Sequence, residues 1–197
     1  EDENAQIYTV KPNRLLGPES FMAVLRDVYE GTPYDLRKAE AAGRYGNPFH
    51  DDPEDYSLCR HATVASFVTE LSRGVMWVAM ACPAMSAYVP IYTDINELPP
   101  SCSQASLGEN EWPSLFWEWK ELGYLIQRRY RIHSEMVRQA VKKYEESLKT
   151  SLMEEAGTLA ALPKDARRAK YTALTHMHIA RARSLCRSLH IRLAEEY

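Results

Sequence analysis

The stretch YSLCRHATVASFVTELSRGVMWVAMACPAMSAYVPIYTDI, residues 56–95, decides the fold. It is the part of the chain with sustained strand character, because β-branched and aromatic side chains recur along it. Breaks at Arg73-Gly74 and Cys82-Pro83 divide it into two or three extended runs. Residues 76–81, around Trp77, are all apolar. Because successive side chains of a strand point to opposite faces of the sheet, both faces of this run are apolar. We therefore predict antiparallel strands at about 56–95, in a sheet that is covered on both faces.

Upstream of this stretch, residues 17–31 have the pattern of a short amphipathic helix. Phe21, Val24, Leu25 and Val28 fall on one stripe at helical spacing, and Gly31 would end the helix. This stripe is expected to face the core. Between the helix and the strands, many Gly, Pro, Asn and Asp residues predict a long irregular connection.

Downstream, apolar residues recur every three to four positions from 115 to 152. This period describes one long helix or two nearly collinear helices. Pro163 opens a second helical pattern that runs to the end of the chain, with an apolar line at Leu174, Met177, Leu185, Leu189 and Leu193. A short connection makes the two helices antiparallel neighbours, so we predict a long helical hairpin.

These elements define an α+β fold. Residues 1–98 are expected to form part of the core that contains the sheet, with its helix and long loop. Residues 99–197 are expected to form a linker and the C-terminal helical hairpin, packed on the same core.

Composition narrows the classes of partner. The net charge of -3 gives no overall basic surface, so nucleic acid is not an expected partner. No apolar run approaches the length of a membrane span, so no membrane partner is expected either. The sequence begins at Glu1 without an initiator Met or a signal peptide. We expect a cytoplasmic protein, and an exported one if a signal lies upstream.

The cysteines and histidines do not have the spacing of a metal site. Cys59, Cys82, Cys102 and Cys186 form no C-x-x-C pair and no disulfide framework. His176 and His178 are two residues apart, so on a helix they point in different directions. We predict no metal ion and no cofactor.

Charged residues suggest two further expectations. Arg60 lies in an otherwise apolar stretch, so it must either form an ion pair, with Glu70 or Asp94, or face an anionic group in a site. The arginines of the last helix are expected to be balanced by the acidic side of the preceding helix, and Glu145 is expected to pair with Lys149. Acidic partners on the preceding helix are Glu145, Glu146, Glu154 and Glu155.

Four strings in this order resemble the downstream part of the C69 family dipeptidases, relatives of the secernins among the N-terminal-nucleophile hydrolases. They are GTPYDL at 31–36, AAGRYGNPF at 41–49, SLCRHATVASFVTEL at 57–71 and VMWVAMACPAMSAYVPIY at 75–92. The resemblance implies an αββα sandwich and hydrolysis of the amide bond of dipeptides. In that family an N-terminal cysteine is the nucleophile and its free α-amino group is the general base.

The resemblance also implies roles for particular residues. Arg60 aligns with the arginine of the family's S-[IL]-x-R motif and would hold the substrate carboxylate or stabilise charge beside the thiolate. Asn47, in the GNP turn, and His61 are expected as substrate-binding neighbours. The family usually has Thr where this chain has His61. The nucleophile is expected on an upstream segment or a companion chain.

Two functions remain open at this stage. One is a cysteine dipeptidase, with a dipeptide as substrate and a homo-oligomeric assembly. The other is a non-enzymatic, secernin-like interaction module, in which the fold persists without a nucleophile and the helical hairpin binds a partner.

Overall fold

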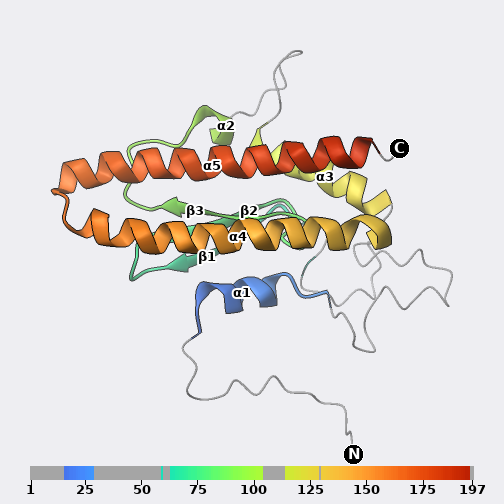
Figure 1. Ribbon diagram of the computed structural model, residues 1–197, viewed down its shortest axis with the longest axis horizontal. Coiled ribbons are helices and arrows are strands. Elements are labelled where there is room, and N and C mark those ends of the chain that lie inside the picture. Colours follow the sequence, from blue (N-terminus) through green and yellow to red (C-terminus); the bar gives the residue numbers. More distant parts are fainter. Residues whose placement is uncertain (1–15, 29–58, 60–62, 104–113, 129, 196–197) are drawn as a thin grey trace, which may run out of the picture.

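The structure is a computed structural model that describes residues 16–28, 59, 63–103, 114–128 and 130–195. The described residues form a mixed α+β fold, in which a three-stranded antiparallel sheet is followed by long helices (Figure 1). This part of the predicted fold is confirmed. The elements are α1 (Pro18–Leu25), β1 (Ala65–Glu70), β2 (Val75–Met80), β3 (Tyr88–Tyr92), α2 (Pro100–Ser103), α3 (Leu115–Arg128), α4 (Tyr130–Ala160) and α5 (Lys164–Ala194).

The sheet has the strand order β1-β2-β3, and Val78 of β2 lies opposite Phe67 on one side and Val89 on the other. A tight turn joins β1 to β2. Its last residue, Gly74, has φ +59°, a conformation that a residue without a Cβ adopts at little cost. The predicted break at Arg73-Gly74 is therefore the turn of a hairpin, and the break at Cys82-Pro83 lies in the connection between β2 and β3.

One face of the sheet packs against the long helices. Trp77 and Ala79 are buried on this face, and the ring of Tyr92 stacks on Tyr171 of α5 with 4.3 Å between ring centres. The opposite face is less covered at β1, where Phe67 is 66% exposed. The expectation that both faces are covered is therefore wrong at β1, the edge strand of the sheet, where alternate residues along one face are exposed.

Helices α4 and α5 form the predicted antiparallel hairpin and lie side by side along the molecule (Figure 1). Pro163 caps the start of α5, where its missing N–H costs no hydrogen bond. Of the predicted apolar line on α5, Met177 is 40% exposed while Leu174, Leu189 and Leu193 are buried. None of the described helices combines the length and apolar character needed to cross a membrane.

Helix α3 does not continue in line with α4. Figure 1 shows the chain reversing direction between the two helices, so that α3 runs back beside α5. Glu118 of α3 contacts Arg183 and Arg187 in the second half of α5, which a collinear α3 could not reach. The expectation of one long helix or two collinear helices is wrong. The predicted spacing of apolar residues is correct. The two helices fold back on each other, however, and Trp119, Leu122 and Ile126 of α3 are buried in the core.

Helix α1 is shorter than predicted and uses a different face. Met22 and Val28 are buried, whereas Phe21 and Val24 are about half exposed. The predicted stripe is wrong for Phe21 and Val24, because α1 ends at Leu25 and packs on β1 along its Met22 side.

Candidate functional site

The site residues predicted from the sequence lie outside the described residues. Arg60, His61 and Asn47 fall within 60–62 and 29–58. Both acidic residues considered as partners of Arg60 contact other cations. Glu70 pairs with Arg73 at 3.2 Å, and Asp94 pairs with Arg168 at 2.7 Å. The role of Arg60 stays a prediction.

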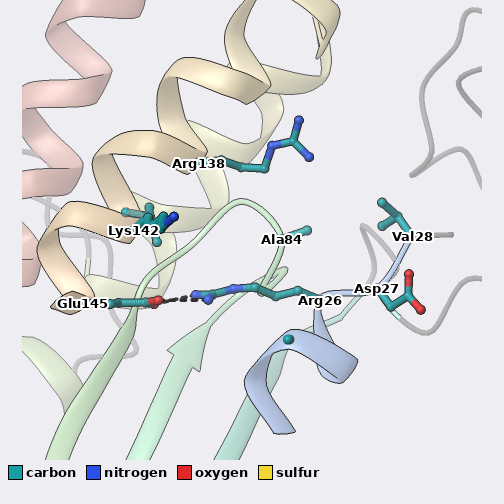
Figure 2. Close-up of a pocket in the computed structure, with 9 residues that line it drawn as sticks. Arg26, Asp27, Val28, Ala84, Arg138, Lys142 and Glu145 are labelled. Atoms are coloured by element: carbon teal, nitrogen blue, oxygen red, sulfur yellow. Dashed lines mark hydrogen bonds and ion pairs between the residues drawn. The ribbon is translucent and has the colours of Figure 1, made fainter. Parts of the chain in front are cut away.

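A pocket opens where the end of α1 meets α4 and the connection between β2 and β3 (Figure 2). Its volume is about 390 Å³, in the range of sites for small molecules. Figure 2 shows Arg138 and Lys142 on α4, across from Asp27 and Val28 on the segment that follows α1. The lining residues are Ala23, Arg26, Asp27, Val28, Ala84, Arg138, Val141, Lys142 and Glu145.

Two cations of α4, Arg138 and Lys142, lie one helical turn apart and form what we call the cationic wall of the pocket. The pocket also contains two carboxylates, those of Asp27 and Glu145, and Glu145 is engaged by Arg26. Arg138 also donates to Glu135 at 2.9 Å on the outer surface of the helix. Guanidinium and ammonium groups at this spacing can accept an anionic group such as a carboxylate.

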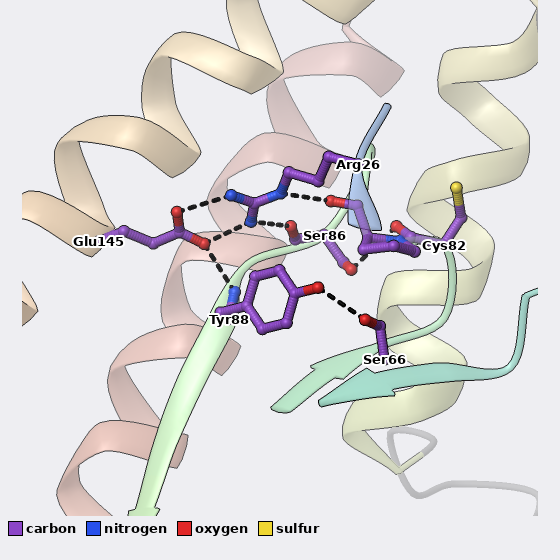
Figure 3. A network of polar contacts seen from close by, with 7 residues as sticks. Arg26, Ser66, Cys82, Ser86, Tyr88 and Glu145 are labelled. Atoms are coloured by element: carbon purple, nitrogen blue, oxygen red, sulfur yellow. Dashed lines mark hydrogen bonds and ion pairs between the residues drawn. The ribbon is translucent and has the colours of Figure 1, made fainter. Parts of the chain in front are cut away.

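Arg26 contacts several of the segments that line this pocket (Figure 3). Its guanidinium donates to both carboxylate oxygens of Glu145, with Nη1–Oε2 at 2.9 Å. It also donates to the backbone oxygens of Pro83 at 2.8 Å and Ser86 at 3.1 Å. The same guanidinium lies over the ring of Tyr88, 4.7 Å from its centre. One side chain thus joins α1, the connection after β2, and α4.

The network continues through Tyr88 into the sheet. The backbone N–H of Tyr88 donates to Glu145 at 2.7 Å, and its hydroxyl lies 2.6 Å from the hydroxyl of Ser66 on β1. Burial raises the pKa of Tyr88, so the phenol stays neutral. Figure 3 shows this chain of contacts running from α4 across the sheet.

The cysteines do not have the environment of a nucleophile. Burial raises the pKa values of Cys82, Cys186 and Cys102 above that of an ordinary thiol. Cys59 is fully buried, and its Sγ lies 3.1 Å from that of Cys82. Since the thiolate is the nucleophilic form, neutral buried thiols react poorly.

The two histidines of α5 have separate surroundings. His176 contacts the backbone oxygen of Glu97 at 3.1 Å, whereas His178 is fully buried with Nε2 3.6 Å from Glu155. Burial lowers the pKa of His178 to about 4. Within the described ranges, no group of three or more His, Cys, Asp or Glu side chains is placed to hold a metal ion.

The ion pairs of the helices differ from those expected. The pairs found for Arg183 and Arg187 join α5 to Glu118 of α3, not to the preceding helix. The charges of Lys170 and Arg181 of α5 act on Glu155 of the preceding helix and lower its pKa, against the larger effect of burial, which raises it. Glu145 contacts Arg26, and Lys149 contacts Glu19 at 3.7 Å, so the predicted pair between positions 145 and 149 is wrong.

Sequence reasoning missed both Glu118 and Arg26. A signal existed for Glu118, which lies three and four residues from Leu115 and Leu122 on the apolar face of its helix. A carboxylate on such a face requires cations from another element. No comparable local signal pointed to Arg26, because its acceptors come from residues 83, 86 and 145.

The described residues form a mixed α+β protein with a pocket lined by charged side chains of both signs, where the connection between β2 and β3 meets α1 and α4. Comparison with known families gives the class: the family model of Peptidase family C69 matches residues 1–143, and the chain belongs to this family. Membership implies a hydrolase of the dipeptidase type. A search of curated proteins found no match.

Proposed function

We propose that this protein is a cysteine dipeptidase that hydrolyses the peptide bond of dipeptides, with an N-terminal cysteine nucleophile outside residues 1–197. The observation that carries the proposal is the match to Peptidase family C69 over residues 1–143. The nucleophile would lie on an upstream segment or a companion chain, and its thiol would attack the carbonyl carbon while the α-amino group takes the proton.

The state of the thiols within the chain supports this assignment. Burial raises the pKa values of Cys82 and Cys186, and partial burial raises that of Cys102. Cys59 is fully buried against Cys82. A catalytic thiol needs access to substrate and a lowered pKa or an adjacent base. The four cysteines therefore fit structural roles better than catalysis.

We assign substrate binding to the pocket beside Arg26. A dipeptide carries a terminal carboxylate, which the cationic wall formed by Arg138 and Lys142 can accept. Arg60 is proposed, from the resemblance, to hold the substrate carboxylate or to stabilise charge beside the thiolate, with His61 and Asn47 as substrate-binding neighbours.

We further propose that residues 1–98 belong to one half of an αββα sandwich, with the linker and hairpin of 99–197 packed on it. The chain would work as a homo-oligomer, without nucleic acid or membrane as a partner. The match ends at residue 143, whereas the hairpin continues to Ala194. This difference favours the second candidate function, an interaction module in which the hairpin binds a partner.

Dipeptide hydrolysis by the complete protein, purified with any companion chain, tests the two candidates. A dipeptidase cleaves unmodified dipeptides and loses this activity after alkylation of its thiols, because the nucleophile is a cysteine. Activity should also require a free carboxylate on the dipeptide, since the pocket wall is cationic. Absence of hydrolysis across a panel of dipeptides would reject the dipeptidase and favour the interaction module.

A further inference from the structure

Two buried cysteines from separate segments meet in the interior. Cys59 lies shortly before β1, and Cys82 lies in the connection between β2 and β3. Their Sγ atoms are 3.1 Å apart, which is only about 1 Å longer than a covalent S–S bond. The two residues are 0% and 2% exposed.

Contacts outside the pair hold both backbones in place. Cys59 donates its N–H to the carbonyl of Asp27 at 3.3 Å. The carbonyl of Cys82 accepts from the N–H of Met85 at 3.0 Å and from the hydroxyl of Ser86 at 2.9 Å. Arg26 fixes the same connection through the carbonyls of Pro83 and Ser86. The sulfurs therefore meet because the fold brings them together at fixed positions.

The surroundings do not favour thiolates at this position. Burial is the main cause that raises the pKa of Cys82, and the neighbouring Cys59 raises it further. A dithiol becomes a strong oxidant when its reduced form is stabilised as a thiolate. That stabilisation is missing here, so a disulfide between these residues would resist reduction.

We propose that Cys59 and Cys82 form a disulfide when the protein meets a low-molecular-weight disulfide of the glutathione type. One cysteine, deprotonated while the site is open, attacks a sulfur of the oxidant, whose S–S bond breaks and releases one thiol. The second cysteine then attacks the protein sulfur of the mixed disulfide, which forms the Cys59–Cys82 bond and releases the second thiol. The two cysteines lose two protons and two electrons, and the oxidant gains them.

The disulfide ties the segment before β1 to the connection after β2. It closes a loop between residues 23 positions apart in the sequence, which restricts the unfolded chain. We expect the oxidised protein to melt roughly 5–10 °C above the reduced protein.

Peptide mapping of the complete protein tests the pair. The protein is unfolded, reduced and refolded in mixtures of reduced and oxidised glutathione, so that burial does not keep the reagent from the thiols. Remaining thiols are alkylated under denaturing conditions before digestion. The proposal predicts a peptide pair cross-linked through Cys59 and Cys82, with Cys102 and Cys186 alkylated. Alkylation of all four cysteines, or a cross-link through Cys102 or Cys186, would overturn it.

Single variants distinguish the effect of the Cys59–Cys82 disulfide on melting temperature from a general effect of oxidation. Cys102→Ser is the matched control, and it should keep the rise in melting temperature on oxidation. Cys59→Ser should lose this rise. A rise in melting temperature that persists in Cys59→Ser would overturn the proposed disulfide. If Cys59→Ser does not fold, peptide mapping of the wild-type protein is sufficient to support or reject the disulfide.

Discussion

Arg26 at the end of α1 donates to the Glu145 carboxylate in the middle of α4, although the two residues are 119 positions apart in sequence. Their bidentate contact is surrounded by the backbone carbonyls of the connection after β2 and by the ring of Tyr88. The pair thereby fixes the relative position of three elements that line the candidate pocket. Its removal should disturb the fold and the pocket together.

Arg26→Ala should lower the free energy of unfolding by about 3 kcal/mol, because it leaves the partly buried Glu145 without its cation. Arg26→Lys should recover part of this loss, since an ammonium cannot reproduce the bidentate contact. Urea unfolding of the purified proteins measures the free energy of unfolding of both variants. Arg138→Ala, which removes a more exposed pair with Glu135, is the matched control and should lower the free energy of unfolding by much less than Arg26→Ala does. Equal losses of unfolding free energy in Arg26→Ala and Arg138→Ala would contradict the central role of Arg26.

Glu118→Gln should destabilise the protein by about 3 kcal/mol. Glu118 is 4% exposed and accepts from both Arg183 and Arg187, so Gln at this position removes the negative charge from two ion pairs that join α3 to α5. Glu121→Gln, at an exposed position on the same helix, is the control and should change stability by less than about 0.5 kcal/mol. The measurement is denaturant unfolding at neutral pH. A stable Glu118→Gln protein would show that the α3–α5 ion pairs do not support the fold.

His178 should make stability depend on pH in acid. Its pKa is about 4 in the folded protein, against an ordinary value of 6.5, because burial disfavours the imidazolium and Arg181 adds to this effect. Between these values the unfolded chain binds a proton that the folded protein does not, so the free energy of unfolding falls as pH drops. The contribution is fully present above pH 6.5 and amounts to roughly 3 kcal/mol.

Comparison with His178→Gln isolates this contribution. Glu155, 3.6 Å from His178, has a raised pKa and therefore acts in the opposite direction, but it is present in both proteins. Unfolding curves collected from pH 7 to pH 4 should be less steeply pH-dependent for His178→Gln. Parallel pH dependences would show that His178 titrates normally in the folded protein.

Arg60→Ala in the complete protein should lower kcat/KM for dipeptides by about 2 kcal/mol or more, because Arg60 is proposed to hold the substrate carboxylate. The melting temperature should remain that of the wild-type protein. Arg192→Ala, at an exposed position near the end of α5, is the control and should leave kcat/KM unchanged. Parallel losses of activity and melting temperature in Arg60→Ala would make Arg60 a structural residue.

The local pattern of the sequence was sufficient to predict the strands and the hairpin. β-Branched and aromatic residues marked the strands, Gly74 marked the turn, and the spacing of Val137, Val141 and Leu148 marked the buried line of α4. These features depend on near neighbours, so they are readable in the chain itself.

Features that depend on distant neighbours were not predictable. The reversal between α3 and α4 places Glu118 beside α5, and the apolar period is the same for collinear and folded-back helices. Arg26 finds its acceptors up to 119 positions away, so no local spacing indicated them. The predicted site residues Arg60, His61 and Asn47 lie outside the described residues, and their roles remain predictions.

The most direct test of the central claim is to locate the catalytic thiol. The complete protein is inactivated with a substoichiometric alkylating reagent, with and without a dipeptide that protects the site, and the labelled peptide is identified by mass spectrometry. We predict that loss of hydrolysis follows labelling of an N-terminal cysteine outside residues 1–197, and that the dipeptide prevents this labelling. Inactivation that follows labelling of Cys59, Cys82, Cys102 or Cys186 instead would contradict the account.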